Sequence, residues 1–155
     1  MTATRGFTLV ELAVTLAVSS VLVAVTVPYL GTAIGNSRAR NTVSKFTQDF
    51  NSLRSLAASG THTVTLTLAS NCSWSANVDG SVDPDRSMTA SNLASSAAGF
   101  TCAALGTTLL PVVFTFSPQG FVQPSATFSF TGSSGQVWPI QVLGSGTIVI
   151  TTGSS

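Results

Sequence analysis

Few side chains in this sequence are of the types that carry out chemistry. The 155 residues contain one histidine, His62, at the start of a segment in which apolar and polar residues alternate. Nucleophilic catalysis needs a nucleophile, a base and a group that orients the base, and one histidine with clustered aspartates offers no such set. His62 is therefore interpreted as a surface or capping residue. The sequence predicts a protein that is not an enzyme and has no cofactor.

Three aspartates lie close together in the chain, and carboxylates are potential metal ligands. Asp79, Asp83 and Asp85, with Asn77 nearby, could chelate calcium through oxygen atoms. Their spacing fits no EF-hand loop, and His62 has no further ligands clustered with it for zinc. A solvated acidic loop is the favoured interpretation. No metal site is predicted, and calcium binding by these aspartates stays open.

Glu11 is an acidic residue at the start of a long apolar run. Between Glu11 and Arg38 lie 26 residues without a charge, more than the ~20 residues that a membrane-crossing helix needs. A carboxylate at the lipid-facing start of such a helix costs about 3 kcal/mol unless it finds a partner. The sequence therefore predicts that something satisfies the charge of Glu11.

The residues around Glu11, Gly6-Phe7-Thr8-Leu9-Val10-Glu11, resemble the class III signal of type IV pilins and type II secretion pseudopilins. The resemblance implies that a membrane-bound prepilin peptidase cleaves between Gly6 and Phe7, and that the new amino terminus of Phe7 is N-methylated. It also implies that Glu11 pairs with the terminal amine of a neighbouring subunit. An ordinary secretory signal peptide fits poorly, because Glu11 lies inside the would-be apolar core and the apolar run is too long.

The resemblance further implies a bacterial inner-membrane protein that crosses the membrane once, with its C-terminal domain in the periplasm. The basic residues do not favour this orientation, because only Arg5 precedes the apolar run and three basic residues follow it. Cys72 and Cys102 give separate evidence on the orientation of the chain in the membrane. An even cysteine count in an exported domain favours one disulfide, which would stabilise the domain by about 3 to 4 kcal/mol. The alternative is a pair of buried reduced cysteines.

Charge is scarce throughout the chain. Charged residues make up 7% of the sequence, far below the roughly 25% usual in soluble domains. From Thr61 onward the only formal charges lie between Asp79 and Arg86, and without the first six residues the chain has as many basic as acidic side chains. Nucleic-acid binding draws its affinity from Lys and Arg that neutralise phosphates. The composition therefore argues against a nucleic-acid partner.

The first 59 residues divide into a leader and two kinds of helix. Residues 1–6 are predicted to be the removed leader, and residues 7–30 a transmembrane helix that also forms the filament core, with a kink at Pro28. Residues 31–59 are predicted to form an amphipathic helix that ends at Ser59-Gly60 and carries a Lys45–Asp49 pair on its solvated face. The apolar face that should pack on the globular domain consists of Val43, Phe46, Phe50, Leu53 and Ala57.

Residues 60–155 are predicted to form an antiparallel β domain, so the expected fold class is α+β, with the long N-terminal helix packed on that domain. Alternation and turn signals predict strands at 64–68, 109–116, 126–131, 137–143 and 147–152. Residues 71–100 are interpreted as a long irregular excursion. Pro139 is expected to mark an edge strand or a bulge, because proline has no N–H to donate.

The order of these elements, with Phe116-Ser117-Pro118-Gln119-Gly120 and a final Gly-x-Gly-x-Ile-Val-Ile hairpin, looks like the GspH/FimT group of minor pilins and pseudopilins. This likeness implies a minor type IV pilin, a structural subunit that helps initiate or cap pilus assembly, with other pilin subunits as partners. A minor pseudopilin of a type II secretion system is the alternative. Some FimT-type members are implicated in DNA uptake through arginines in the last hairpin, but residues 146–150 contain no basic residue, which makes a DNA-uptake pilin the third choice.

Overall fold

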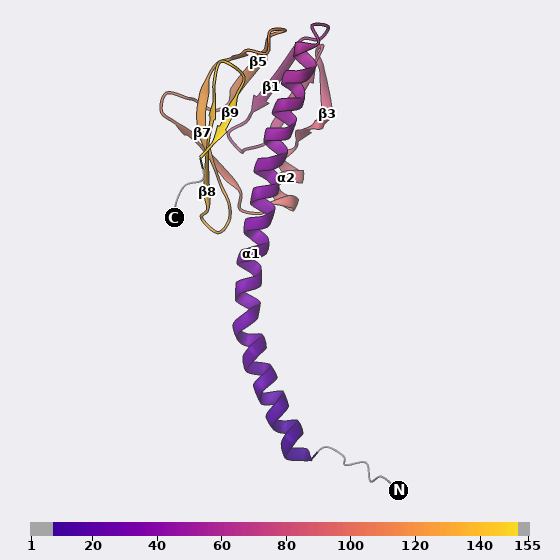
Figure 1. The fold of residues 1–155 in the computed structure, drawn as a ribbon, viewed down its shortest axis with the longest axis vertical. Helices are drawn as coiled ribbons and strands as arrows, with labels where there is room; N and C mark the ends of the chain where they lie inside the picture. The colour runs from indigo at the N-terminus through magenta and orange to yellow at the C-terminus, as the bar shows by residue number, and fades with distance from the viewer. Residues whose placement is uncertain (1–7, 152–155) are drawn as a thin grey trace. The chain divides into compact units, whose positions relative to one another are not determined.

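The structure is a computed structural model that describes the chain from Thr8 to Thr151, apart from the side chains of residues 25–30. One long helix, α1 (Leu9–Ala58), comes first, and nine strands and one short helix follow within the described residues (Figure 1). The chain divides between Ile34 and Gly35 into two compact units. A long N-terminal helix followed by an antiparallel β domain confirms the predicted α+β class.

In the first unit, α1 exposes apolar side chains on all sides. Thr8 caps the helix, because its hydroxyl accepts a hydrogen bond from the backbone N–H of Glu11 at 3.3 Å. The hydroxyls of Thr15, Ser19 and Ser20 donate to carbonyls about one turn earlier, so these polar groups need no partner outside the helix. The large apolar side chains that are more than half exposed are Leu9, Val10, Leu12, Val14, Leu16, Val18, Val21, Leu22 and Val23.

Pro28 falls within the bounds of α1, which run from Leu9 to Ala58. Its side chain lies outside the described residues, so the kink expected there stays a prediction. The leader expected at residues 1–6 also lies outside the described part of the chain.

In the second unit, α1 buries one apolar face. Val43, Phe46, Phe50, Leu53 and Ala57 are each at most 4% exposed, as the spacing of three and four residues predicted. Gly60 follows the end of the helix with φ of 77°, and its N–H donates to the Ala57 carbonyl at 3.0 Å. Glycine adopts this left-handed conformation without steric cost, which is why the helix can stop here.

The β domain contains two antiparallel sheets (Figure 1). The first sheet has the strand order β3 (Ser81–Met88), β2 (Trp74–Val78), β1 (Val64–Leu68), β5 (Val112–Phe116) and β6 (Val122–Gln123). The second sheet has the order β4 (Thr101–Leu105), β7 (Ala126–Thr131), β8 (Val137–Val142) and β9 (Ile148–Ile150). A short helix, α2 (Ala90–Ser96), connects β3 to β4 and begins at the N-cap residue Thr89.

The prediction that residues 71–100 form a long irregular excursion is wrong, because β2, β3 and α2 all lie there. Asp79 and Gly80 join β2 to β3 in a tight turn, with φ of 53° and 83°. Asp-Gly is a typical sequence for a two-residue hairpin turn that needs two positive φ angles. β3 escaped notice because it is a polar edge strand, and edge strands face water and often carry charges and proline.

The expectation for Pro139 is also wrong. β8 lies between β7 and β9, and Pro139 pairs with Ser129 in a regular register without a bulge. The Pro139 carbonyl accepts a hydrogen bond from the N–H of Thr151 at 3.1 Å, one residue beyond the end of β9. The N–H and C=O of a residue in an antiparallel strand point to the same side. The missing N–H of Pro139 therefore faces Thr151, beyond the last residue of β9, where the ladder ends.

Aromatic rings fill the centre of the core. The ring of Phe46 lies 5.3 Å from Trp74 in the first sheet, and 5.7 and 5.4 Å from Phe128 and Phe130 in the second, measured between centroids. Phe50 lies one turn further along α1 and packs on two phenylalanines of β5. Because Phe46 contacts both sheets, the helix is part of the core of the domain rather than an addition to it.

Gly132→Ala should destabilise the domain by about 1 to 3 kcal/mol, because the added methyl group overfills a packed site. A Cβ atom at Gly132 would lie 2.8 Å from the Cβ of Ala39 and 3.3 Å from the ring of Trp138, and both residues are buried. Urea unfolding of the full chain in mild detergent measures the effect. Gly31→Ala is the control, since a Cβ there meets nothing within 4 Å. Equal unfolding midpoints for Gly132→Ala and wild type would contradict this close approach.

Candidate functional site

Glu11 lies in the first turn of α1, and its side chain is exposed. Its neighbours Val10 and Leu12 are 71% and 56% exposed, so the carboxylate sits on an apolar surface. The partial positive charge at a helix N-terminus favours an anion here. The ion pairs of the described residues do not include Glu11. Within the described part of the chain Glu11 is thus available to a group from another molecule. Gly6 and Phe7, the expected cleavage site, lie outside the described residues.

The exposed apolar surface around Glu11 indicates a contact with lipid or with another protein. Soluble monomers rarely expose continuous apolar patches of more than a few hundred Å², and larger ones mark contacts with proteins or membranes. Residues 9–24 present such a patch around the whole helix. Among the residues described, no helix is both long enough and apolar enough to cross a membrane.

The structure contains the disulfide expected between Cys72 and Cys102, with 5.5 Å between the two Cα atoms. Cys72 follows β1 in the first sheet, and Cys102 lies in β4 at the edge of the second sheet. Cys72 is 2% exposed. Cys102 is half-buried. The bond therefore links the two sheets covalently, and neither cysteine has a free thiol.

The aspartates of the expected acidic loop lie in the turn between β2 and β3 (Asp79) and in β3 itself (Asp83 and Asp85). Asp79 accepts a hydrogen bond of 2.6 Å from His62 Nδ1 and one of 2.8 Å from the N–H of Thr63, which lower the pKa of Asp79. Partial burial would raise the pKa of Asp83, but hydrogen bonds from Arg86 outweigh it and hold that pKa below its usual value. In the described ranges no group of three potential ligands is placed to hold a metal ion.

Lys45 and Asp49 pair as predicted, but not on a solvated face. Lys45 Nζ donates to both carboxylate oxygens of Asp49, at 3.1 and 2.9 Å, and Asp49 is only 7% exposed. The indole N–H of Trp74 also donates to Asp49, at 2.9 Å. A buried carboxylate is tolerated only when it is paired and hydrogen-bonded, and both conditions are met here. Asp49 therefore fastens α1 to β2.

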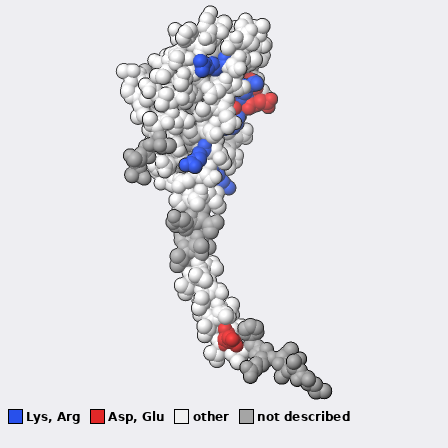
Figure 2. Space-filling model, viewed as in Figure 1, with Lys and Arg blue, Asp and Glu red and all other residues white. Residues whose placement is uncertain are grey.

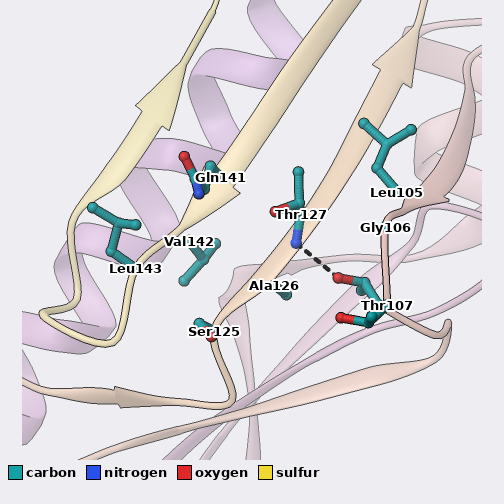
Figure 3. A pocket seen from close by; sticks show the side chains of 10 residues that line it. Leu105, Gly106, Thr107, Ser125, Ala126, Thr127, Gln141, Val142 and Leu143 are labelled. Carbon is teal, nitrogen blue, oxygen red and sulfur yellow. Dashed lines mark hydrogen bonds between the residues drawn. The ribbon is translucent and has the colours of Figure 1, made fainter.

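The surface of the β domain carries little charge. Figure 2 shows a mostly uncharged face with a few basic side chains and one place where acidic and basic side chains lie together. A surface pocket of about 380 Å³ lies at the end of the second sheet, between the loop after β4 and the facing ends of β7 and β8 (Figure 3). The N–H of Thr127 donates to the Thr108 hydroxyl there at 2.8 Å. The lining residues include no acid, base or thiol.

Comparison with known families finds a match at the start of the chain. Residues 1–27 match the family model of the prokaryotic N-terminal methylation motif, the type IV prepilin-like signal. The matched range includes Gly6, Phe7 and Glu11. This signal, together with a long N-terminal helix and an antiparallel β domain, is similar to what type IV pilin-like proteins have. The motif implies processing by a prepilin peptidase, a membrane-anchored precursor and pilin-type assembly. Comparisons with curated proteins and with solved structures give no match.

Proposed function

We propose that this type IV pilin-like protein is a minor type IV pilin of the GspH/FimT group, a non-catalytic subunit that helps initiate or cap pilus assembly. The observation that carries the proposal is the methylation motif over residues 1–27, a range that includes the exposed apolar first part of α1. The order of the later elements supports the group, since β1, β5 and a final β8–β9 hairpin follow the helix in the expected sequence. The precursor is held in the bacterial inner membrane with its β domain in the periplasm.

The mechanism rests on one helix that is covered by lipid first and by protein later. Cleavage after Gly6 creates a positively charged amino terminus at Phe7, four residues before Glu11. When the subunit leaves the membrane, the apolar surface of α1 packs against the helices of neighbouring subunits. The Glu11 carboxylate then meets the terminal amine of a neighbour, and the pairing offsets the cost of burying each charge. The β domain faces outward.

A minor pseudopilin of a type II secretion system is the second candidate, because the same signal and the same apolar helix serve both machines. Deleting the gene in its own host separates the two, since loss of surface pili supports the first candidate and loss of secreted enzymes supports the second. A DNA-uptake pilin is the third candidate. The β8–β9 hairpin has no basic residue to neutralise phosphates, which argues against it.

Glu11→Ala should leave cleavage and membrane insertion intact but reduce incorporation into filaments by about tenfold or more. The substitution removes the carboxylate and leaves the terminal amine of the neighbour unpaired at a buried position. Immunoblots of sheared filaments and of membranes from the same cells measure both quantities.

Asp85→Ala is the matched control for Glu11→Ala, since it also removes one exposed carboxylate but lies in the β domain. We expect its incorporation to equal that of the wild type. Incorporation of Glu11→Ala at the wild-type level would refute the assembly role of Glu11.

A further inference from the structure

Among the described residues, Arg38 and Arg40 are the two arginines whose guanidinium groups have no partner in the fold. Both side chains are exposed, and neither guanidinium has an ion pair or hydrogen bond within the described residues. The other described cations have partners: Lys45 binds Asp49, Arg54 donates to the Gly120 carbonyl at 2.9 Å, and Arg86 binds Asp83. The two arginines are therefore free to bind an anion from outside the chain.

The two arginines lie on opposite flanks of α1. They are two residues apart, which places them about 200° apart around the helix axis but only ~3 Å apart along it. Ala39, between them, is 1% exposed. Side chains that diverge in this way cannot hold one small anion together. Both can reach the same plane perpendicular to the helix, so they suit a layer of anions better than a single one.

The position of the arginines along the chain agrees with such a layer. Ile34 is the last exposed large apolar residue of α1 before them. The 26 uncharged residues between Glu11 and Arg38 have a helical length of about 40 Å. A bilayer with its headgroup regions is about 40 to 45 Å thick. A run of this length is enough to cross a bilayer, so in a chain anchored through these residues Arg38 and Arg40 are the first charged side chains after the span.

The turn of the β domain that lies beside the arginines has no acidic residue. The turn between β7 and β8 lies beside this part of α1, as the bond from the Ser134 hydroxyl to Asn36 and the close approach of Gly132 to Ala39 show. Residues 132–135 of this turn are glycines and serines. The nearest acidic residue further along α1, Asp49, is already paired with Lys45 and bonded to Trp74.

We propose that Arg38 and Arg40 bind the phosphate groups of anionic lipids at the surface of the membrane that holds the precursor. This inference rests on the membrane-anchored precursor of the proposed function. Guanidinium groups bind phosphate oxygens through two parallel hydrogen bonds, and basic residues next to a membrane span are attracted by anionic lipids. The contact holds the β domain at the membrane surface until assembly extracts the subunit.

The test uses the full chain, transferred from neutral detergent micelles into vesicles of phosphatidylcholine alone or of phosphatidylcholine with phosphatidylglycerol. Flotation gives the partition coefficient. We expect partitioning of the wild type to be about 30-fold stronger into the anionic vesicles, since two arginines contribute. The double variant Arg38→Gln/Arg40→Gln should lose this preference, and Arg38→Lys/Arg40→Lys, which retains both charges, should keep most of it. The unfolding midpoint should not change in either variant, because both side chains are exposed and have no ion pair within the described residues.

The outcomes separate the lipid contact from the proposed function. A chain that enters neither kind of vesicle overturns membrane anchoring and the lipid contact together. A chain that enters both kinds equally, or a glutamine variant that keeps the wild-type preference, overturns the lipid contact alone. Displacement by inorganic phosphate beyond that by sodium chloride of equal ionic strength would identify a small-anion site instead. Tighter binding to duplex DNA than to the anionic vesicles, lost in the glutamine variant, would identify a nucleic-acid contact and also overturn the proposal.

Discussion

Phe46→Ala should destabilise the β domain by about 3 to 5 kcal/mol, the usual cost of removing a buried phenylalanine ring. Phe46 is fully buried, and its ring contacts Trp74 of the first sheet and Phe128 and Phe130 of the second. The cavity would open where the helix meets both sheets, so a small relaxation of one element cannot close it. Since a typical domain has only about 5 to 15 kcal/mol of stability, most of it would be lost.

Urea unfolding of the full chain in mild detergent measures the loss, and the midpoint is the quantity to compare. Phe121→Ala is the matched control, because it removes the same ring from a position that is 55% exposed. It should shift the free energy of unfolding by about 0.5 kcal/mol or less. Similar losses for the two variants would contradict the central place of Phe46 in the core.

Cys72→Ser combined with Cys102→Ser should reduce the stability of the domain by about 3 to 4 kcal/mol. The two cysteines are 30 residues apart, and opening a loop of this length returns that much entropy to the unfolded chain in the loop-closure account. The bond also joins sheets that would otherwise be connected here only through packing. The destabilisation should appear as a lower urea midpoint.

A reductant provides the control for this prediction. Dithiothreitol should lower the midpoint of the wild type to that of the double serine variant and leave the variant unchanged. Thiol labelling gives an independent check on the exported, folded protein. Labelling of both cysteines without reductant would contradict the disulfide and would weaken the assignment of the β domain to an oxidising compartment.

The elements with strong alternation could be predicted from the sequence. β1, β7 and β8 place apolar residues at every second position over at least part of their length, and the structure contains all three close to the expected bounds. β2 had the same signal in Trp74 and Ala76, both buried, followed by the Asp79-Gly80 turn. The surrounding serines and asparagines obscured it. β3 has no alternation of apolar and polar residues. It is a strand because it pairs with β2, which the sequence alone does not show.

Some residues of the candidate site could also be predicted from the sequence, and others could not. Glu11 could be found because a charge at the start of an apolar run is a local and costly feature. The buried position of Asp49 could not be found, because its partner Trp74 is 25 residues away on β2. Helical periodicity places Asp49 at the edge of the buried face, and only the tertiary structure shows that an indole N–H meets it there. Likewise, the sequence does not show which basic side chains have partners. Only the structure shows that Lys45, Arg54 and Arg86 are bonded and that Arg38 and Arg40 are not, within the described residues.

The most direct test is the mass of the mature amino terminus, measured on protein extracted from membranes of a host that has a prepilin peptidase. A prepilin-like subunit is cut between Gly6 and Phe7, so the first peptide should begin at Phe7 and carry one added methyl group. Gly6→Ala should leave the chain uncut from Met1, whereas Gly31→Ala, a glycine substitution within α1, should be processed like the wild type. A wild-type chain that keeps residues 1–6, or that begins anywhere other than Phe7, would contradict the assignment.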